Sequence, residues 1–131
     1  MKRRSLAVLG MVLVLLLPLI GCTVGSYRLS GSMVFGGSSA RGSYRSFDGY
    51  RARAVRLSEG QRIRVTGEIE TENGSLIIKL VEPSGDDLWK VTSGNERFES
   101  EMVIPDSGRY WVRVEADDHS GQFNISWDRL Q

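Results

Sequence analysis

The alternation of apolar and polar residues along most of the chain is the feature that most constrains its fold. In the segment 61–70, the branched apolar residues Ile63, Val65 and Ile69 share one face, and charged side chains occupy the other. This two-residue repeat is that of a half-buried β-strand, since a helix repeats every 3.6 residues. The pattern returns at intervals of about ten residues, separated by turn signals. The sequence therefore predicts an all-β fold, an antiparallel β-sandwich of seven to eight short strands.

Two of the turn signals predict tight hairpins. Asn73-Gly74 lies between two alternating segments, and both residues tolerate the positive φ that a type I′ turn requires. The polar stretch from Asp117 to Gly121 is expected to close the last hairpin. This stretch contains His119, the only histidine of the chain.

Chain length and cysteine content limit how such a fold is stabilised. The chain has 131 residues and one cysteine, Cys22. Roughly 110 residues follow the apolar N-terminal segment, enough for one hydrophobic core but not for two. We expect one domain at residues 43–131, stabilised by apolar burial without disulfide bonds.

The N-terminus has the organisation of a secretory signal. Lys2, Arg3 and Arg4 precede an apolar run from Leu6 to Leu17, and Pro18 follows. A basic region followed by an apolar core is typical of a signal peptide. Because the run is shorter than the roughly 20 residues that cross a bilayer as a helix, we predict a signal peptide over residues 1–21 and no permanent transmembrane helix.

The end of this segment, Leu19-Ile20-Gly21-Cys22, resembles the lipobox of bacterial lipoproteins, in which an aliphatic residue and two small or branched positions precede an obligatory cysteine. The resemblance implies cleavage after Gly21 and diacylglyceryl transfer to the Cys22 sulfur. Two acyl chains hold a protein stably on a membrane. We therefore expect a lipoprotein anchored through Cys22 on the extracytoplasmic face of the cell membrane.

Residues 22–42 are expected to be a lipidated tether. Between Thr23 and Gly42 there are five Gly and five Ser in 20 residues, a composition typical of a flexible linker. Within this segment, Tyr27-Arg28-Leu29 and Met33-Val34-Phe35 are apolar enough to add a short edge strand.

Charge is unevenly distributed along the exported chain. Residues 22–131 carry 14 Lys plus Arg against 16 Asp plus Glu, a balance that argues against a nucleic-acid partner. Residues 23–65 carry eight Arg and two acidic residues, whereas residues 66–131 carry six basic and fourteen acidic residues. Either Arg-bearing strands lie beside Glu-bearing strands, or a basic face turns toward anionic lipid or cell-wall polymer.

One stretch, Ile104–Val114 (IPDSGRYWVRV), resembles the penultimate hairpin of bacterial pre-peptidase C-terminal domains and of the related GOLD-type and CUB-like jelly rolls. In those domains a turn ending in Gly precedes Tyr-x-Val-x-Val. Leu57–Val65 and the turn Glu82-Pro83-Ser84-Gly85 fit the same outline. The resemblance implies a jelly-roll-like β-sandwich that acts as a non-catalytic accessory or binding module.

No constellation of residues predicts catalysis or a metal site. His119 has Asp118 and Ser120 as sequence neighbours, but adjacent residues in a hairpin loop cannot adopt the geometry of a catalytic triad. One cysteine and one histidine do not supply a Cys/His zinc site. The acidic pairs Asp86-Asp87 and Asp117-Asp118 favour solvated turns over calcium ligands. We therefore predict a protein that is not an enzyme and that uses no metal or cofactor.

Aromatic and aliphatic residues offer the better functional hypothesis. Trp111, Ile77 and Val81 lie opposite the main apolar rows of their strands. Trp89 either contributes to the same patch or belongs to the core. Either the segment Met33–Phe35 covers this apolar outer face, or it is an exposed patch for a sugar ring or a partner protein. The sequence thus predicts a binding or assembly module at the cell envelope, with a carbohydrate or wall-polymer binding module as the alternative. An envelope protein or a glycan is the expected partner.

Overall fold

The chain is built from long antiparallel strands. The structure, a computed structural model, describes residues 23–92 and 96–130. Within these residues there are six strands and no helix: β1 (Thr23–Phe35), β2 (Ser39–Leu57), β3 (Arg62–Val81), β4 (Asp87–Thr92), β5 (Glu96–Val103) and β6 (Gly108–Leu130). The prediction of an all-β antiparallel fold is confirmed, with fewer and longer strands than expected. No helix in the described part is long and apolar enough to span a membrane. The predicted signal peptide and the predicted lipidation site Cys22 lie outside the described residues.

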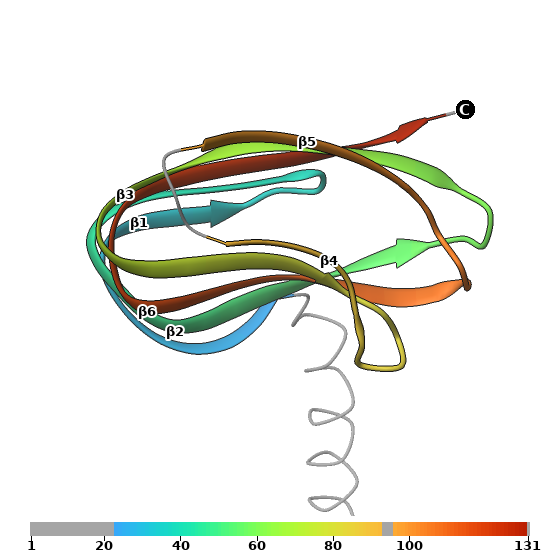
Figure 1. The fold of residues 1–131 in the computed structure, drawn as a ribbon. Coiled ribbons are helices and arrows are strands. Elements are labelled where there is room, and N and C mark those ends of the chain that lie inside the picture. Colours follow the sequence, from blue (N-terminus) through green and yellow to red (C-terminus); the bar gives the residue numbers. More distant parts are fainter. Residues whose placement is uncertain (1–22, 93–95, 131) are drawn as a thin grey trace, which may run out of the picture.

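The sandwich forms because four of the strands bend and continue in a second layer (Figure 1). The strand order is β1-β2-β6-β3-β4, and β5 pairs with the other half of β3. We call the layer that contains β4 the β4 layer; it also holds residues 23–30, 49–57, 75–81 and 108–117. The β5 layer contains β5 with residues 31–35, 39–44, 62–71 and 119–130. Each of the strands β1, β2, β3 and β6 therefore contributes one half to each layer.

The two predicted hairpins are bends within continuous strands. Around Asn73-Gly74 the register of β3 on β6 shifts twice, between Thr71 and Asn73 and between Asn73 and Ser75. Gly74 has φ 75° and Asp118, on β6, has φ 44°. Positive φ redirects the strand across the sandwich here instead of reversing it, because each half of β3 pairs with a half of β6. The hairpin predictions at 72–75 and 117–121 were wrong for this reason.

The segment assigned by composition to a tether forms β1 and the start of β2. Pairing of β1 with β2 runs from Thr23↔Arg53 to Phe35↔Ala40. The side chain of Met33 is buried in the core, and Phe35 packs against it. These two residues face inward from an edge strand. They therefore do not cover the outer face of the β4 layer, which was one of the two alternatives drawn from the sequence. The strand body thus begins at Thr23 instead of at residue 43.

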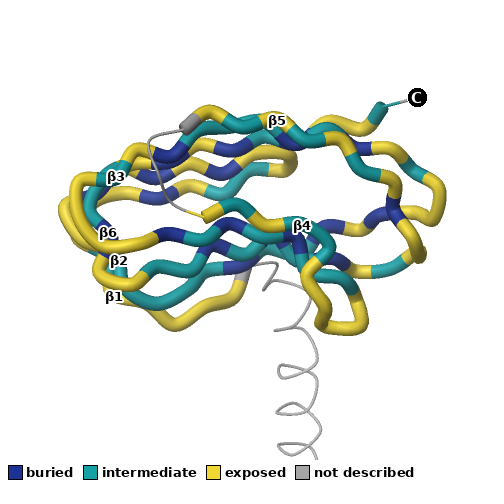
Figure 2. The backbone as a smooth tube through the Cα atoms, in the orientation of Figure 1, coloured by how far each residue is buried: buried dark blue, intermediate teal, exposed yellow. Residues whose placement is uncertain are grey.

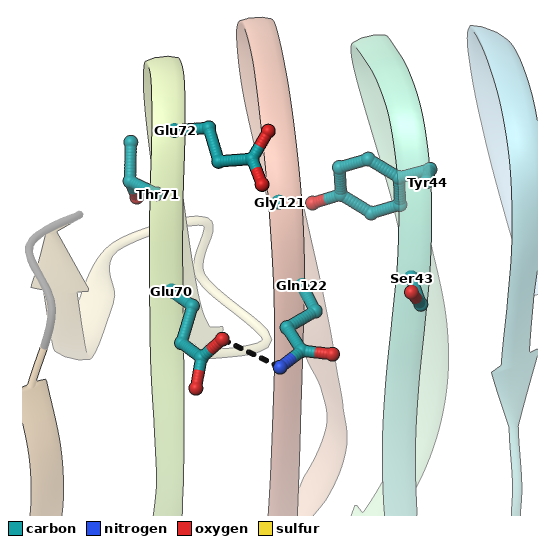
Figure 3. A pocket seen from close by; sticks show the side chains of 7 residues that line it. All are labelled: Ser43, Tyr44, Glu70, Thr71, Glu72, Gly121 and Gln122. Atoms are coloured by element: carbon teal, nitrogen blue, oxygen red, sulfur yellow. Dashed lines mark hydrogen bonds between the residues drawn. The ribbon is translucent and has the colours of Figure 1, made fainter.

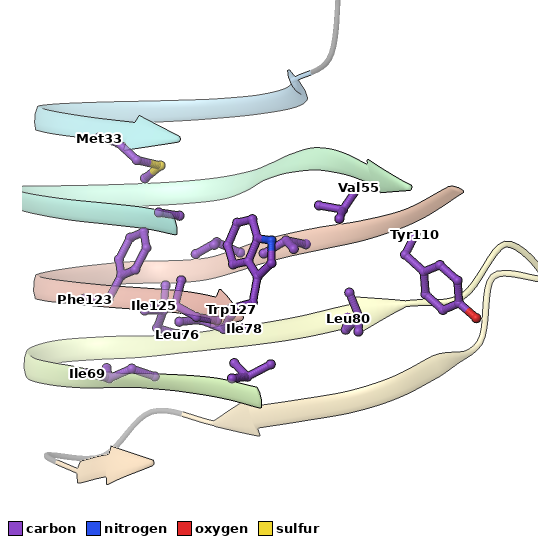
Figure 4. Close-up of a cluster of buried hydrophobic side chains, with 14 of the residues drawn as sticks. Met33, Val55, Ile69, Leu76, Ile78, Leu80, Tyr110, Phe123, Ile125 and Trp127 are labelled. Carbon is purple, nitrogen blue, oxygen red and sulfur yellow. The ribbon is translucent and has the colours of Figure 1, made fainter. Parts of the chain in front are cut away.

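The hydrophobic core lies between the two layers (Figure 2). Ile63, Val65 and Ile69 are buried, as their alternation predicts. Side chains from β2, β3 and β6 of both layers interdigitate there (Figure 4). The largest side chains with almost no exposure are Tyr110, Phe47, Phe123, Leu57, Ile63, Ile69, Leu76, Ile78 and Ile104.

Arginines bridge the two layers on the β1 side and pair with an acid within the β5 layer. On the β1 side, Arg51 Nη1 donates to the Met33 carbonyl oxygen at 3.3 Å, and Arg53 Nη1 reaches the Phe35 carbonyl oxygen at 3.5 Å. On the β5 side, Arg64 Nη2 lies 2.7 Å from Glu101 Oε1. The hydrogen bond and charge of Arg64 hold the pKa of the Glu101 carboxyl below its ordinary value. Placement of an Arg-bearing strand beside a Glu-bearing strand, one of the two interpretations of the charge asymmetry, is confirmed here.

Replacing Tyr110 with phenylalanine is expected to lower the free energy of unfolding by about 1 kcal/mol. The Tyr110 hydroxyl donates to the Asp106 carbonyl oxygen at 2.7 Å, and the side chain has 0% exposure. The ring still fills the core after the change, so the loss is confined to this hydrogen bond and to a longer one, in which the hydroxyl accepts from the Asp106 N–H at 3.4 Å. Urea denaturation measures the difference, and a value near zero would show that water replaces the phenol at the Asp106 carbonyl.

Candidate binding surfaces

Three of the four predicted patch residues share one face. Val81 is the cross-strand neighbour of Trp111, and Ile77 that of Glu115, so all lie on the outer face of the β4 layer. Trp89 instead pairs with the buried Leu80, which places it on the inner face. There its ring lies 5.6 Å from that of Phe98. The prediction for Trp89 as part of an outer patch is therefore not supported by its position.

The middle of this outer face is occupied by an ion-pair network. Lys79 Nζ lies 3.1 Å from Glu115 Oε1 and 3.6 Å from Asp87 Oδ1. Arg113 Nε lies 2.5 Å from Glu115 Oε1, and its guanidinium stands 4.0 Å from the centroid of the Tyr50 ring. Burial alone would raise the pKa of Glu115, but Lys79 and Arg113 hold it below its ordinary value. Lys79 and Arg113 thus form ion pairs with acids of the same chain.

A polar groove lies on the outer face of the β5 layer, at the end nearest the bend (Figure 3). Its first hollow measures about 560 Å³ and lies between β2 and β3, above β6. A second hollow of about 410 Å³ continues from it, because both share Ser43 and Gln122. We call the two hollows together the β5-layer groove. Volumes of this order are typical of ligand sites.

Paired amide and carboxylate side chains line the groove. Gln122 Nε2 donates to Glu70 Oε2 at 2.6 Å, and two residues along the strands Asn124 Nδ2 donates to Glu68 Oε1 at 3.3 Å. Each pair joins β6 to β3. Every group keeps further donor or acceptor capacity, since an amide offers two N–H groups and a carboxylate several lone pairs. Arg41 of β2 adds a cation to the second hollow.

Gly121 lines the first hollow between β2 and β3. A Cβ at this position would collide with the Glu70 carbonyl oxygen, so the neighbouring strand requires glycine here. Figure 3 shows β6 bare at Gly121, with Glu72 on one side and Tyr44 on the other. The glycine thus forms the floor between two polar walls.

His119 lies buried beneath these walls with 0% exposure, and not in a polar turn as expected. Its Nδ1 is 2.7 Å from the Tyr44 hydroxyl, and its Nε2 is 2.9 Å from Thr71 Oγ1. Burial lowers the pKa of His119 and raises that of Tyr44. The neutral imidazole therefore holds β2 and β3 together through β6.

The structure also separates the residues that resemble a catalytic triad in sequence. Ser120 Oγ donates to the Arg45 carbonyl oxygen at 2.5 Å, whereas the imidazole of His119 bonds Tyr44 and Thr71. Within the described residues, one group of acids lies close enough to share a cation: Asp48, Asp117 and Asp118, with carboxylate oxygens within 4.8 Å. All three are exposed there, in keeping with solvated acids.

Sequence reasoning did not identify the groove. Outward-facing polar residues are the ordinary complement of a half-buried strand, and Glu70 and Gln122 are 52 positions apart. The repeated outward spacing of Glu68 and Glu70, and of Gln122 and Asn124, was the one available signal.

Comparison with known proteins establishes the fold class. No family model matches the sequence, and no curated protein matches it. Among solved structures, the chain resembles the carbohydrate-binding module CBM4, with a TM-score of 0.52 and 8% identity over 84% of this chain and 81% of that one. The protein therefore belongs, by fold alone, with antiparallel β-sandwich domains of this kind.

Two further structures are similar at lower TM-scores. TmCBM61 in complex with β-1,4-galactotriose has a TM-score of 0.46 and 16% identity, over 79% of this chain and 88% of that one. The pre-peptidase C-terminal domain of collagenase from Bacillus anthracis has a TM-score of 0.48 and 14% identity, over 80% and 90%.

Proposed function

We propose that the protein is an exported lipoprotein, anchored through Cys22, that binds a glycan without catalysing a reaction. The observation that carries the proposal is the β5-layer groove, in which two amide groups of β6 are each paired with a carboxylate of β3. A sugar hydroxyl both donates and accepts hydrogen bonds, so a chain of sugars needs both kinds of partner along its length. The groove offers such a row to solvent.

The polarity of the groove favours a glycan over an assembly partner. The centres of protein interfaces are depleted of charged residues and enriched in large aromatic residues. The β5-layer groove instead carries Glu68, Glu70 and Arg41 at its surface. The fold supports the same choice, since it is shared with CBM4 and since jelly rolls occur in lectin domains.

The test is a glycan array followed by titration calorimetry of the best ligand. Gln122→Ala and Glu70→Gln are each expected to weaken binding at least tenfold, because each removes one of the paired groups and leaves its partner unmatched. Circular dichroism of both variants should remain that of the parent protein, since both side chains are exposed.

Trp111→Ala is the matched control, and it also tests the binding patch predicted from the sequence. Trp111 lies on the other layer, so we expect its loss to change glycan affinity less than twofold. An array without ligands, or an affinity that depends on Trp111 and not on Gln122, would overturn the assignment to the groove.

A further inference from the structure

Two arginines lie directly opposite each other on the outer face of the β4 layer. Arg56 of β2 is the cross-strand neighbour of Arg109 of β6, and both are exposed. Arg129 comes close as well, since its Nη2 donates to the Arg56 carbonyl oxygen at 3.1 Å. No acidic side chain in the described part of the chain forms an ion pair with Arg56 or Arg109.

Like charges directly opposite on neighbouring strands destabilise a sheet. Lys79 also faces like charges across the strands, Lys90 and Arg113. There the acids Glu115 and Asp87 form ion pairs with Lys79, as Glu101 does with Arg64 on the β5 layer. The Arg56–Arg109 pair departs from that pattern at the end of the β4 layer farthest from the bend. An anionic partner outside the chain would relieve the repulsion.

Apolar side chains surround this pair on the same face. The next cross-strand pair of β2 and β6 on this face is Ala54↔Trp111, and Trp111 has Val81 as its other neighbour. Val24 of β1 is 43% exposed and pairs with Ala52 on this face. We call the set Val24, Arg56, Val81, Arg109 and Trp111 the docking face. Arginine beside a half-buried tryptophan and aliphatic groups suits the boundary between lipid headgroups and acyl chains.

The position of β1 indicates which surface this face meets. β1 begins at Thr23, so the Cys22 sulfur belongs to the residue immediately before the strand. One residue spans at most about 3.6 Å, which leaves no tether between a lipid on Cys22 and the β4 layer. Strand β1 begins in the β4 layer and only later continues into the β5 layer, which carries the groove.

We propose that the docking face lies against anionic lipid headgroups of the membrane that carries the Cys22 anchor. This inference rests on the lipid anchor of the proposed function. An anionic membrane surface attracts arginines that lie close to it, and the anchor keeps the face at a high effective concentration beside the lipid. Of the acids on the same face, Glu115 and Asp87 are engaged by Lys79 and do not oppose the contact. The groove then faces away from the membrane, toward a glycan.

The experiment uses the full chain, processed in a bacterial host and reconstituted into vesicles of phosphatidylcholine alone or with phosphatidylglycerol. Flotation in 1 M NaCl reports the anchor, and quenching of tryptophan fluorescence by brominated lipid reports the docking face. Both vesicle types should float the protein, and quenching should be at least twofold greater with phosphatidylglycerol. Quenching should disappear in Trp111→Phe, because Trp127 is buried and Trp89 faces inward.

Charge variants separate the docking face from general attraction. In R56E/R109E we expect the anionic-specific quenching to fall at least threefold, whereas R28E/R45E, with the same change of charge at exposed positions near the bend, should keep it. Unchanged circular dichroism of both variants excludes misfolding. A protein that floats but shows equal quenching in both vesicles overturns the docking and leaves the anchor standing. A protein that does not float overturns both.

Discussion

Replacing Gly74 with alanine is expected to lower the free energy of unfolding by at least about 3 kcal/mol. Gly74 has φ 75°, a conformation that costs energy for any residue with a Cβ. The new methyl group would also collide with the Asp118 carbonyl oxygen of the facing strand. The residues on both sides of Gly74 are paired with β6, Asn73 with Ser120 and Ser75 with Asp117, so the two backbones cannot move apart cheaply. Urea denaturation of the variant measures the loss.

Gly60→Ala is the matched control for this effect. Gly60 has φ 81°, close to that of Gly74, but a Cβ there would meet no atom within 4 Å. The control variant therefore retains the backbone strain without the collision, and we expect it to lose only about 1 kcal/mol. If the two variants lost the same free energy of unfolding, the bend at Gly74 would be free to relax. That result would contradict the description of β3 and β6 as continuous paired strands.

Gly74 also shows how much of the fold the local sequence could predict. Asn73-Gly74 correctly signals positive φ at Gly74, because that preference is a property of the residue itself, but Asn73 does not have positive φ. Whether positive φ reverses a strand or bends it depends on what the following half pairs with. Residues 76–81 pair with residues 111–116 of β6, a partner remote in sequence. The fold class was therefore predictable from the alternation, whereas the joining of both layers by the same strands was not.

A similar limit applies to the candidate surfaces. The period of two placed Trp111, Ile77 and Val81 on an outer face correctly, since alternation fixes which residues share a face of a strand. For Trp89 the face depended on its register against Leu80, which the short strand β4 does not reveal by itself. The β5-layer groove could not be predicted from the sequence, because its amide–carboxylate pairs form only when β3 and β6 come into register.

His119→Ala is expected to destabilise the protein by about 3 kcal/mol at pH 7, since a buried ring is lost and the Tyr44 hydroxyl loses its partner. His119→Gln should cost less, because an amide can hydrogen-bond both Tyr44 and Thr71 from the same position. Urea denaturation of the two variants gives the comparison. A loss as large in the glutamine variant as in the alanine variant would show that shape, and not hydrogen bonding, dominates at this position.

The pH dependence of stability distinguishes titration of the His119 imidazole from packing of its ring. Burial lowers the pKa of His119 in the folded protein below the ordinary value of 6.5. As the pH falls below about 6.5, the unfolded chain therefore binds a proton that the folded chain does not, and stability decreases until the pH reaches the folded pKa. Above that range His119 contributes no slope. The free energy of unfolding should accordingly fall between pH 7 and pH 5 in the parent protein, and fall less in His119→Gln, where nothing at this position titrates. Parallel curves for the two proteins would mean that His119 takes up its proton as readily when folded as when unfolded, which its burial beneath Tyr44 and Thr71 opposes.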